Sequence, residues 1–175
     1  MENEGHYISN ELTSDGNLPL FTPESFVNSL GKTLGEANRL ITMLLRHEGL
    51  GELVPSHGDI LIYLFSSENT VTMQTLASVI HRDPSTVTAL VKKLTVAGYV
   101  HTEKNPTDRR VTEVSLTAVG RKLQDRFQKI SSALVDAQMN GIDSAAFAIT
   151  CKTLNIIKEN FAQACERLDE EGDRR

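Results

Sequence analysis

The feature that most constrains the fold is a pair of short amphipathic segments joined by only three residues, His81-Arg82-Asp83. Thr72 is a suitable N-cap for the first segment, and Asp83-Pro84 supplies an N-cap and a first helical residue for the second. Apolar residues recur at helical spacing in both segments: Met73, Leu76, Ala77 and Ile80, then Val87, Leu90, Val91 and Leu94. So short a connection is typical of a helix-turn-helix.

After Gly98 the spacing of apolar residues changes from that of a helix to that of a strand. A glycine here suits the left-handed backbone conformation that commonly ends an α-helix. Residues 99–104 and 111–116 alternate as strands, and the turn residues Asn105-Pro106-Thr107-Asp108 lie between them. The sequence therefore predicts a β-hairpin whose tip, Asp108-Arg109-Arg110, is basic. A hairpin of this kind is typical of a DNA-binding wing.

Longer helical patterns flank this region. Thr22-Pro23 predicts the start of a long amphipathic helix that ends before Gly49, and a capping box from Ser56 to Asp59 predicts a shorter, largely buried helix. Two more helices are expected, one capped by Thr117 and ended by Gly141, and one capped by Ser144. The seam of the last helix is long and has coiled-coil spacing: Phe147, Thr150, Leu154, Ile157, Phe161, Ala164 and Leu168.

These elements predict a mainly α protein with a minor β component, a winged helix-turn-helix with long terminal helices that form a dimerisation bundle. We expect a flexible tail over 1–20 and a winged DNA-binding lobe over 54–116. The helical dimerisation region takes in 21–53 and 117–168, and a charged tail covers 169–175.

Composition and charge agree with a globular, non-membrane protein. The chain has 175 residues, of which 39% are hydrophobic and 23% charged. Its first 20 residues lack the basic and apolar regions of a secretory signal, and two cysteines suit a reducing compartment, so we expect a cytoplasmic location without a membrane partner. The net charge is −5, yet residues 72–116 hold six bases and four acids and form a modestly basic island.

The second helix of the helix-turn-helix presents small hydroxyls and lysines on its outward face. Small side chains near a helix start can approach base edges, and lysines can reach phosphates. At the hairpin tip, an arginine is suited to a narrow minor groove, and Asp108 is expected to hold the guanidinium of Arg110 by a bidentate pair. The predicted DNA-contact residues are Arg82, Ser85, Thr86, Thr88, Lys92, Lys93, Asp108, Arg109 and Arg110.

Residues 76–123 resemble the winged helix-turn-helix core of the MarR family of bacterial transcriptional regulators. The resemblance rests on four elements: residues 83–88 (DPSTVT), Leu94 with Gly98, Asp108-Arg109-Arg110, and Leu116-Thr117-x-x-Gly120. It implies an obligate homodimer that binds a pseudo-palindromic double-stranded DNA operator, most often as a repressor, with half-sites about 10 bp apart. It also implies that Ser85, Thr86, Thr88 and Lys92 enter the major groove, Arg110 the minor groove, and that Arg109 lies near the backbone.

The same resemblance implies a small-molecule effector, commonly a phenolic or other amphipathic carboxylate, in a crevice between the dimerisation helices and the winged lobe. The expected lining is Met43, Arg46, His47, His57, Ile60 and Tyr63. The alternative is that Ile60 and Tyr63 belong to the core and that the others are solvated helix ends.

Metal and redox inputs are weaker alternatives. His47, Glu48, His57 and Asp59 flank one loop but have no fixed ligand spacing, so we expect no metal and no cofactor. Cys151 and Cys165 lie about 21 Å apart along one predicted helix and cannot bridge within a chain. They are expected to be structural thiols, with a bridge between subunits as the redox alternative.

Two other classes of protein compete with a DNA-binding regulator. The sequence has no Gly-rich phosphate loop, nucleophile elbow, His-Glu-x-x-His or Cys-x-x-Cys motif, so we do not expect the protein to be an enzyme. A winged-helix adaptor that binds protein instead of DNA is expected to lose its wing arginines, and this chain keeps Arg109 and Arg110.

Overall fold

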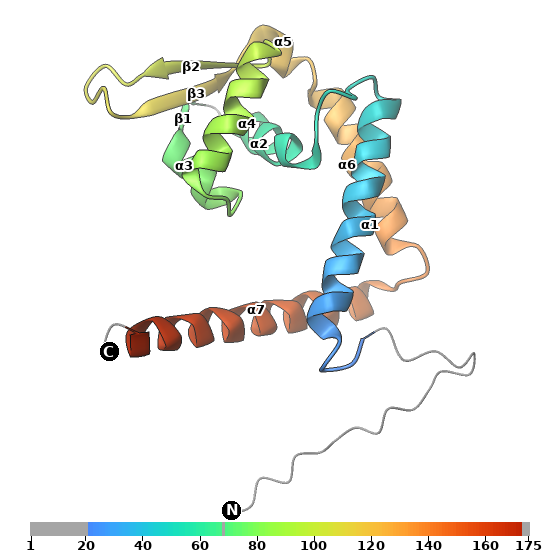
Figure 1. The fold of residues 1–175 in the computed structure, drawn as a ribbon. Coiled ribbons are helices and arrows are strands. Elements are labelled where there is room, and N and C mark those ends of the chain that lie inside the picture. Colours follow the sequence, from blue (N-terminus) through green and yellow to red (C-terminus); the bar gives the residue numbers. More distant parts are fainter. Residues whose placement is uncertain (1–20, 68, 173–175) are drawn as a thin grey trace, which may run out of the picture. The chain divides into compact units, whose positions relative to one another are not determined.

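A computed structural model describes residues 21–67 and 69–172, so the expected tail over 1–20 lies outside the described residues. Seven helices and three strands follow one another in these residues (Figure 1). They are α1 (Phe26–His47), α2 (Pro55–Phe65), β1 (Val71–Thr72), α3 (Met73–Val79), α4 (Pro84–Val96), β2 (Val100–Lys104), β3 (Thr112–Leu116), α5 (Ala118–Arg121), α6 (Gln124–Met139) and α7 (Ser144–Gly172). This mainly helical winged helix-turn-helix confirms the expected fold class.

The sheet is antiparallel, in the order β1-β3-β2. The β2–β3 hairpin is the predicted wing, and its register pairs Val100 with Leu116 and Lys104 with Thr112. β1 adds a third strand by pairing Val71 with Val114. The sequence did not predict β1, because two residues are too few to show an alternating pattern.

The helix-turn-helix of α3 and α4 begins as its caps predict. The Thr72 hydroxyl accepts the Thr75 N–H at 3.0 Å, and Asp83 accepts the Thr86 N–H at 2.9 Å. Gly98 has the expected positive φ, 76°. The three-residue turn also places His81 at φ 51°, a conformation that a residue with a Cβ adopts rarely and that nothing in the sequence signals.

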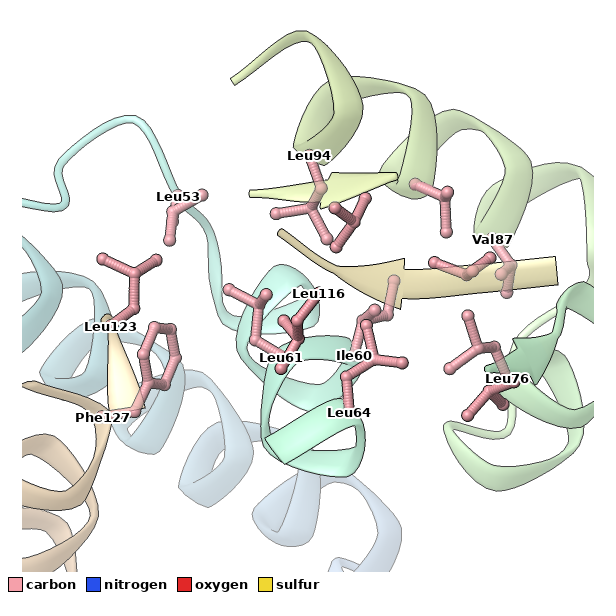
Figure 2. Close-up of a cluster of buried hydrophobic side chains, with 14 of the residues drawn as sticks. Leu53, Ile60, Leu61, Leu64, Leu76, Val87, Leu94, Leu116, Leu123 and Phe127 are labelled. Atoms are coloured by element: carbon pink, nitrogen blue, oxygen red, sulfur yellow. The ribbon is translucent and has the colours of Figure 1, made fainter. Parts of the chain in front are cut away.

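The core of the winged lobe lies between α2, α4 and the sheet. Ile60 and Leu61 from α2, Leu94 from α4 and Val114 from β3 have no exposed surface. Figure 2 shows these helices and the sheet contributing side chains to one cluster. The apolar character of α2 on most faces follows from this central position. At one end of the cluster, Phe127 of α6 packs on Phe65 of α2 with ring centroids 5.6 Å apart.

A tight junction closes the base of the wing. Thr117 donates its backbone N–H to the Tyr99 carbonyl at 3.0 Å, and its hydroxyl accepts the Gly120 N–H at 2.9 Å. A Cβ on Gly120 would lie 2.0 Å from the Tyr99 oxygen, so this position needs glycine. The single helix predicted after Thr117 is wrong: the chain forms the short α5, and Leu123 bonds back to Gly120 before α6 begins.

Three predicted helix starts differ in detail from the structure. Thr22 and Ser25 exchange hydrogen bonds in a turn that precedes α1, so the regular helix begins at Phe26 and not at Pro23. Neither Ser56 nor Asp59 caps α2, because Val54 takes the cap position and donates its N–H to Nδ1 of His57 at 3.1 Å. Asp143, not Ser144, caps α7 by accepting the Ala146 N–H at 2.8 Å.

Contacts divide the chain into two compact units, one ending at Ile130 and the other beginning at Ser131. Within the second unit, α7 is 29 residues long and none of its residues is buried. It continues to Gly172, past the expected helix end at residue 168. The remaining domain boundaries stay a prediction. Across residues 21–67 and 69–172, no helix combines the length and apolar character needed to cross a membrane.

Candidate nucleic-acid interface

The exposed face of α4 carries the predicted polar residues, while its other face is core. Val87, Val91 and Leu94 are buried. Thr86 is half-buried. The other predicted DNA-contact residues of this region are exposed: Arg82, Ser85, Thr88, Lys92 and Lys93. The sequence period therefore assigned the inner and outer faces of this helix correctly.

Asp83 organises the first turn of α4. One carboxylate oxygen accepts the Thr86 N–H and the Ser85 hydroxyl, and the other accepts the Thr86 hydroxyl. These hydrogen bonds hold the pKa of Asp83 well below its usual range, because they favour the charged form. Asp83 therefore stays ionised, and its negative charge interacts favourably with the positive end of the α4 helix dipole.

The tip of the wing is held by side-chain to backbone hydrogen bonds. Asn105 Oδ1 accepts the N–H groups of Thr107 and Asp108 at 2.9 and 3.0 Å, and Asp108 Oδ1 accepts the Arg110 N–H at 2.9 Å. Among the described residues, no ion pair joins Asp108 to the Arg110 guanidinium. The predicted bidentate pair is therefore wrong for the free protein, since Asp108 fixes the backbone of the turn instead.

The wing turn also has a support that the sequence did not reveal. Glu113 of β3 accepts from Asn105 Nδ2 at 2.6 Å and from the Thr70 hydroxyl at 3.1 Å. Glu113 thus links the start of β1 to the wing turn. Its place in the strand pattern is that of an ordinary solvated glutamate, so no sequence signal identified it.

The role of Asp108 as a turn residue gives a testable expectation. Asp108→Asn keeps a side-chain oxygen for the Arg110 N–H, so its affinity for DNA is expected to stay within about threefold of wild type. Asp108→Ala loses that acceptor and is expected to weaken binding by about 3- to 10-fold, since one hydrogen bond contributes about 1 kcal/mol. Fluorescence anisotropy compares the two variants. Equal losses in both would contradict the turn role and favour a charge role.

A groove of about 730 Å³ lies between α4 and the wing and brings together residues predicted from both. Thr88 and Lys92 from α4 and Arg110 from the wing line it, along with apolar residues such as Val91. Figure 1 shows the β2–β3 hairpin extending beside α4, the element that carries this polar face. The two cationic side chains suit an anionic backbone along this groove.

Other predicted DNA contacts lie elsewhere. Arg82 lines a separate groove between α1 and α2 together with Arg39 and Asp59. Partial burial of the Asp59 carboxyl group raises its pKa. Lys93 shares a third groove, of about 630 Å³, with Lys92 and His57. Arg109 is exposed at the wing tip.

The expected effector residues do not come together in the three grooves described above. Ile60 is fully buried, as the alternative of a core residue expected, and Met43, Arg46 and His47 are exposed on α1. Tyr63 is half-buried and packs against the core. Only His57 lines one of these grooves.

His57 itself is unusual. It is 2% exposed, its Nδ1 accepts the Val54 N–H, and its Nε2 has no hydrogen-bond partner within residues 21–67 and 69–172. Burial, together with the positive charge of Lys93, lowers the pKa of His57. The ring is therefore neutral at pH 7, with its proton on the unpartnered Nε2.

The described residues of the single chain give no support to the metal alternative and do not test a cysteine bridge between subunits. In the described part of the chain, no three His, Cys, Asp or Glu side chains gather as metal ligands, so His47, Glu48, His57 and Asp59 do not form a cluster. His47 Nδ1 instead lies 3.6 Å from Glu48 Oε1. Cys151 and Cys165 are free and exposed on α7, so neither is a buried thiol within the single chain.

Sequence comparisons identify the winged region. The sequence profile of the MarR family matches residues 55–112. The HTH-type transcriptional regulator YdcH of Bacillus subtilis is 32% identical over 106 residues, which cover 61% of this chain and 63% of that protein. The HTH-type transcriptional repressor IacR of Pseudomonas putida is 30% identical over 77 residues, 44% of this chain and 46% of that protein. The matches thus span less than two thirds of either relative.

Comparisons of structure agree on the fold. A Staphylococcus aureus MepR–DNA complex matches with a TM-score of 0.70 at 18% identity, over 80% of this chain and 98% of that one. A MarR transcriptional regulator from Methanosarcina mazei Go1 matches with a TM-score of 0.67 at 22% identity, with the same coverage. These names describe regulators and not enzymes, in agreement with the sequence. Residues 55–112 of the chain thus match the MarR family in sequence, and the chain is similar in fold to a solved MarR transcriptional regulator.

Proposed function

We propose that this protein is a sequence-specific DNA-binding transcriptional regulator, of the repressor kind. The observation that carries the proposal is the groove in which Thr88 and Lys92 of α4 face Arg110 of the wing. A helix face with small hydroxyls suits the major groove, lysines suit phosphates, and an exposed wing arginine suits a narrow minor groove. The names of the relatives YdcH and IacR support the same function.

The experiment that tests this function is enrichment from a random duplex pool with the purified protein. We expect a pseudo-palindromic sequence whose half-sites lie about 10 bp apart, because two recognition helices of a dimer then face the same side of the duplex. A pool that remains random after repeated rounds would contradict DNA recognition. It would favour the adaptor alternative, in which the winged lobe binds protein.

The proposed regulator acts as a homodimer. The support is α7, a 29-residue helix that buries none of its residues in the single chain. Its exposed apolar side chains are Ile149, Ile156, Phe161 and Leu168. A helix that leaves so much apolar surface uncovered needs a partner, and the seam spacing suits a second copy of the same helix.

Phe161→Glu is expected to convert the dimer to a monomer. The Phe161 side chain is 51% exposed in the single chain, so the change leaves the fold intact and places a carboxylate in the proposed dimer interface, where burial costs several kcal/mol. Light scattering measures the mass, which should fall to the 19.3 kDa of one chain. Gln163→Glu, which adds the same charge off the seam, is the matched control. A Phe161→Glu protein that remains dimeric would show that this face of α7 is not the interface.

The finer part of the proposal is that a small amphipathic carboxylate relieves repression. The groove lined by His57, Lys92 and Lys93 supports it, since the two exposed lysines offer ammonium groups that pair with a carboxylate. Its walls include the apolar Leu53 and Val96. A ligand that occupies these lysines competes with phosphates for them. Salicylate added to the protein–operator complex is the probe, and we expect DNA release. An anisotropy that stays constant up to millimolar salicylate would contradict this part.

A further inference from the structure

Each of the three hydroxyl groups on the exposed start of α4 donates its proton within the protein. Ser85 and Thr86 donate to the two carboxylate oxygens of Asp83. Thr88 donates to the Pro84 carbonyl oxygen at 2.7 Å. Predicted DNA contacts thus coincide with groups whose only proton is already engaged.

The direction of these hydrogen bonds is fixed by the acceptors. A carbonyl oxygen cannot donate, and an ionised carboxylate cannot donate either. Asp83 is ionised at neutral pH because three hydrogen bonds stabilise its charge. A hydroxyl has one proton and two lone pairs, so these hydroxyls offer only lone pairs to any molecule that approaches α4.

We propose that Asp83 sets the base preference of this helix by making Ser85 and Thr86 hydrogen-bond acceptors toward DNA. In the major groove, only the amino groups of adenine N6 and cytosine N4 donate, whereas guanine N7 and O6, thymine O4 and the phosphates accept. The bases that face Ser85 and Thr86 are therefore adenine or cytosine. This inference rests on the proposed DNA-binding function and names the part of the operator that α4 reads.

Lys92, in contrast, carries only donors and suits phosphates or guanine. The first turn of α4 thus reads amino groups, and Lys92 and Lys93, about two turns later, provide the charge. Asp83 does not touch DNA in this scheme. It is a positioning residue that acts through the two hydroxyls.

Asp83→Asn separates this role from helix capping. Asparagine caps a helix about as well as aspartate, so α4 is retained. Its oxygen, in the place of Oδ1, still accepts from the Thr86 N–H and the Ser85 hydroxyl. Its amide nitrogen, in the place of Oδ2, donates to the Thr86 hydroxyl, whose own proton then turns outward. The base that faces Thr86 should change from adenine or cytosine to guanine or thymine.

The test compares sequences enriched from a random duplex pool by wild type, Asp83→Asn, and Asp83→Asn combined with Thr86→Val. We expect the single variant to shift its preference about 3- to 10-fold at one base pair in each half-site, the size of one hydrogen bond. The double variant should lose discrimination at that base pair. Asp136→Asn, which makes the same change of charge at an exposed position of α6, is the matched control and should keep the wild-type preference.

A second measurement does not depend on the fold of any Asp83 variant. Wild type is titrated with duplexes in which purine replaces adenine, or pyrimidin-2-one replaces cytosine, at each operator position in turn, because each analogue lacks the amino group. A loss of about 3- to 10-fold at a position where Thr86→Val shows no loss supports the inference. If Asp83→Asn keeps every wild-type preference, or if neither analogue has a Ser85- or Thr86-dependent effect, the inference is overturned. If wild type enriches no sequence, the proposed function itself is overturned.

Discussion

Gly120→Ala should lower the free energy of unfolding by about 3 kcal/mol or more, the upper end of the usual effect of overpacking. The new Cβ would lie 2.0 Å from the Tyr99 carbonyl oxygen and 2.9 Å from its carbon. Both atoms belong to the backbone, so they cannot move aside as a flexible side chain can. Relief requires α5 to separate from the base of the wing, which breaks the bond between the Thr117 N–H and the same oxygen.

Thermal unfolding measures this effect. For a chain of this size, each kcal/mol shifts Tm by about 2–4 °C, so a loss of roughly 6–12 °C is expected. Gly31→Ala in α1 is the matched control, because a Cβ there meets nothing within 4 Å and alanine favours a helix by about 1 kcal/mol. A Gly120→Ala protein as stable as wild type would show that the junction of α5 and the wing is looser than the structure indicates.

Arg110→Ala should weaken binding of the enriched duplex by about 10- to 100-fold while the mass in solution and Tm stay unchanged. The Arg110 side chain is exposed and lines the groove beside α4, so its removal takes a cation from the proposed interface without opening the core. Alanine retains the backbone N–H that Asp108 accepts, so the wing turn is kept.

Anisotropy titration measures the loss of affinity. If Arg110 also neutralises a backbone phosphate, the slope of log affinity against log salt concentration should decrease in size by about one. Lys32→Ala is the control. Lys32 is an exposed cation of α1 that lines none of the three grooves described above. Equal affinity of the Arg110→Ala and wild-type proteins for the duplex would show that the wing arginine does not contribute to DNA binding.

Much of the fold could be predicted because its local signals agree with its packing. Asp83, Thr72 and Gly98 lie at the helix ends that their side-chain chemistry favours. The alternation in the wing strands predicted which side chains are buried, and Val114 and Leu116 lie in the core. Periodicity also separated the inner from the outer face of α4.

The errors arose where long-range contacts decide the local structure. The break between α5 and α6 follows from the close approach of Gly120 to Tyr99, 21 residues earlier in the chain. The start of α2 depends on His57, which takes the capping role that Ser56 and Asp59 were expected to share. Sequence spacing predicted that Asp108 acts near Arg110, but it could not distinguish a backbone acceptor from a guanidinium partner.

The most direct test of the central claim is a fluorescence-anisotropy titration of the 175-residue protein against its enriched duplex and a scrambled duplex, at two salt concentrations. We predict binding that prefers the enriched duplex by about 10³-fold or more and that weakens steeply as salt rises, because lysine and arginine release counterions from the phosphates. Equal and weak binding to both duplexes would contradict sequence-specific recognition by α4 and the wing.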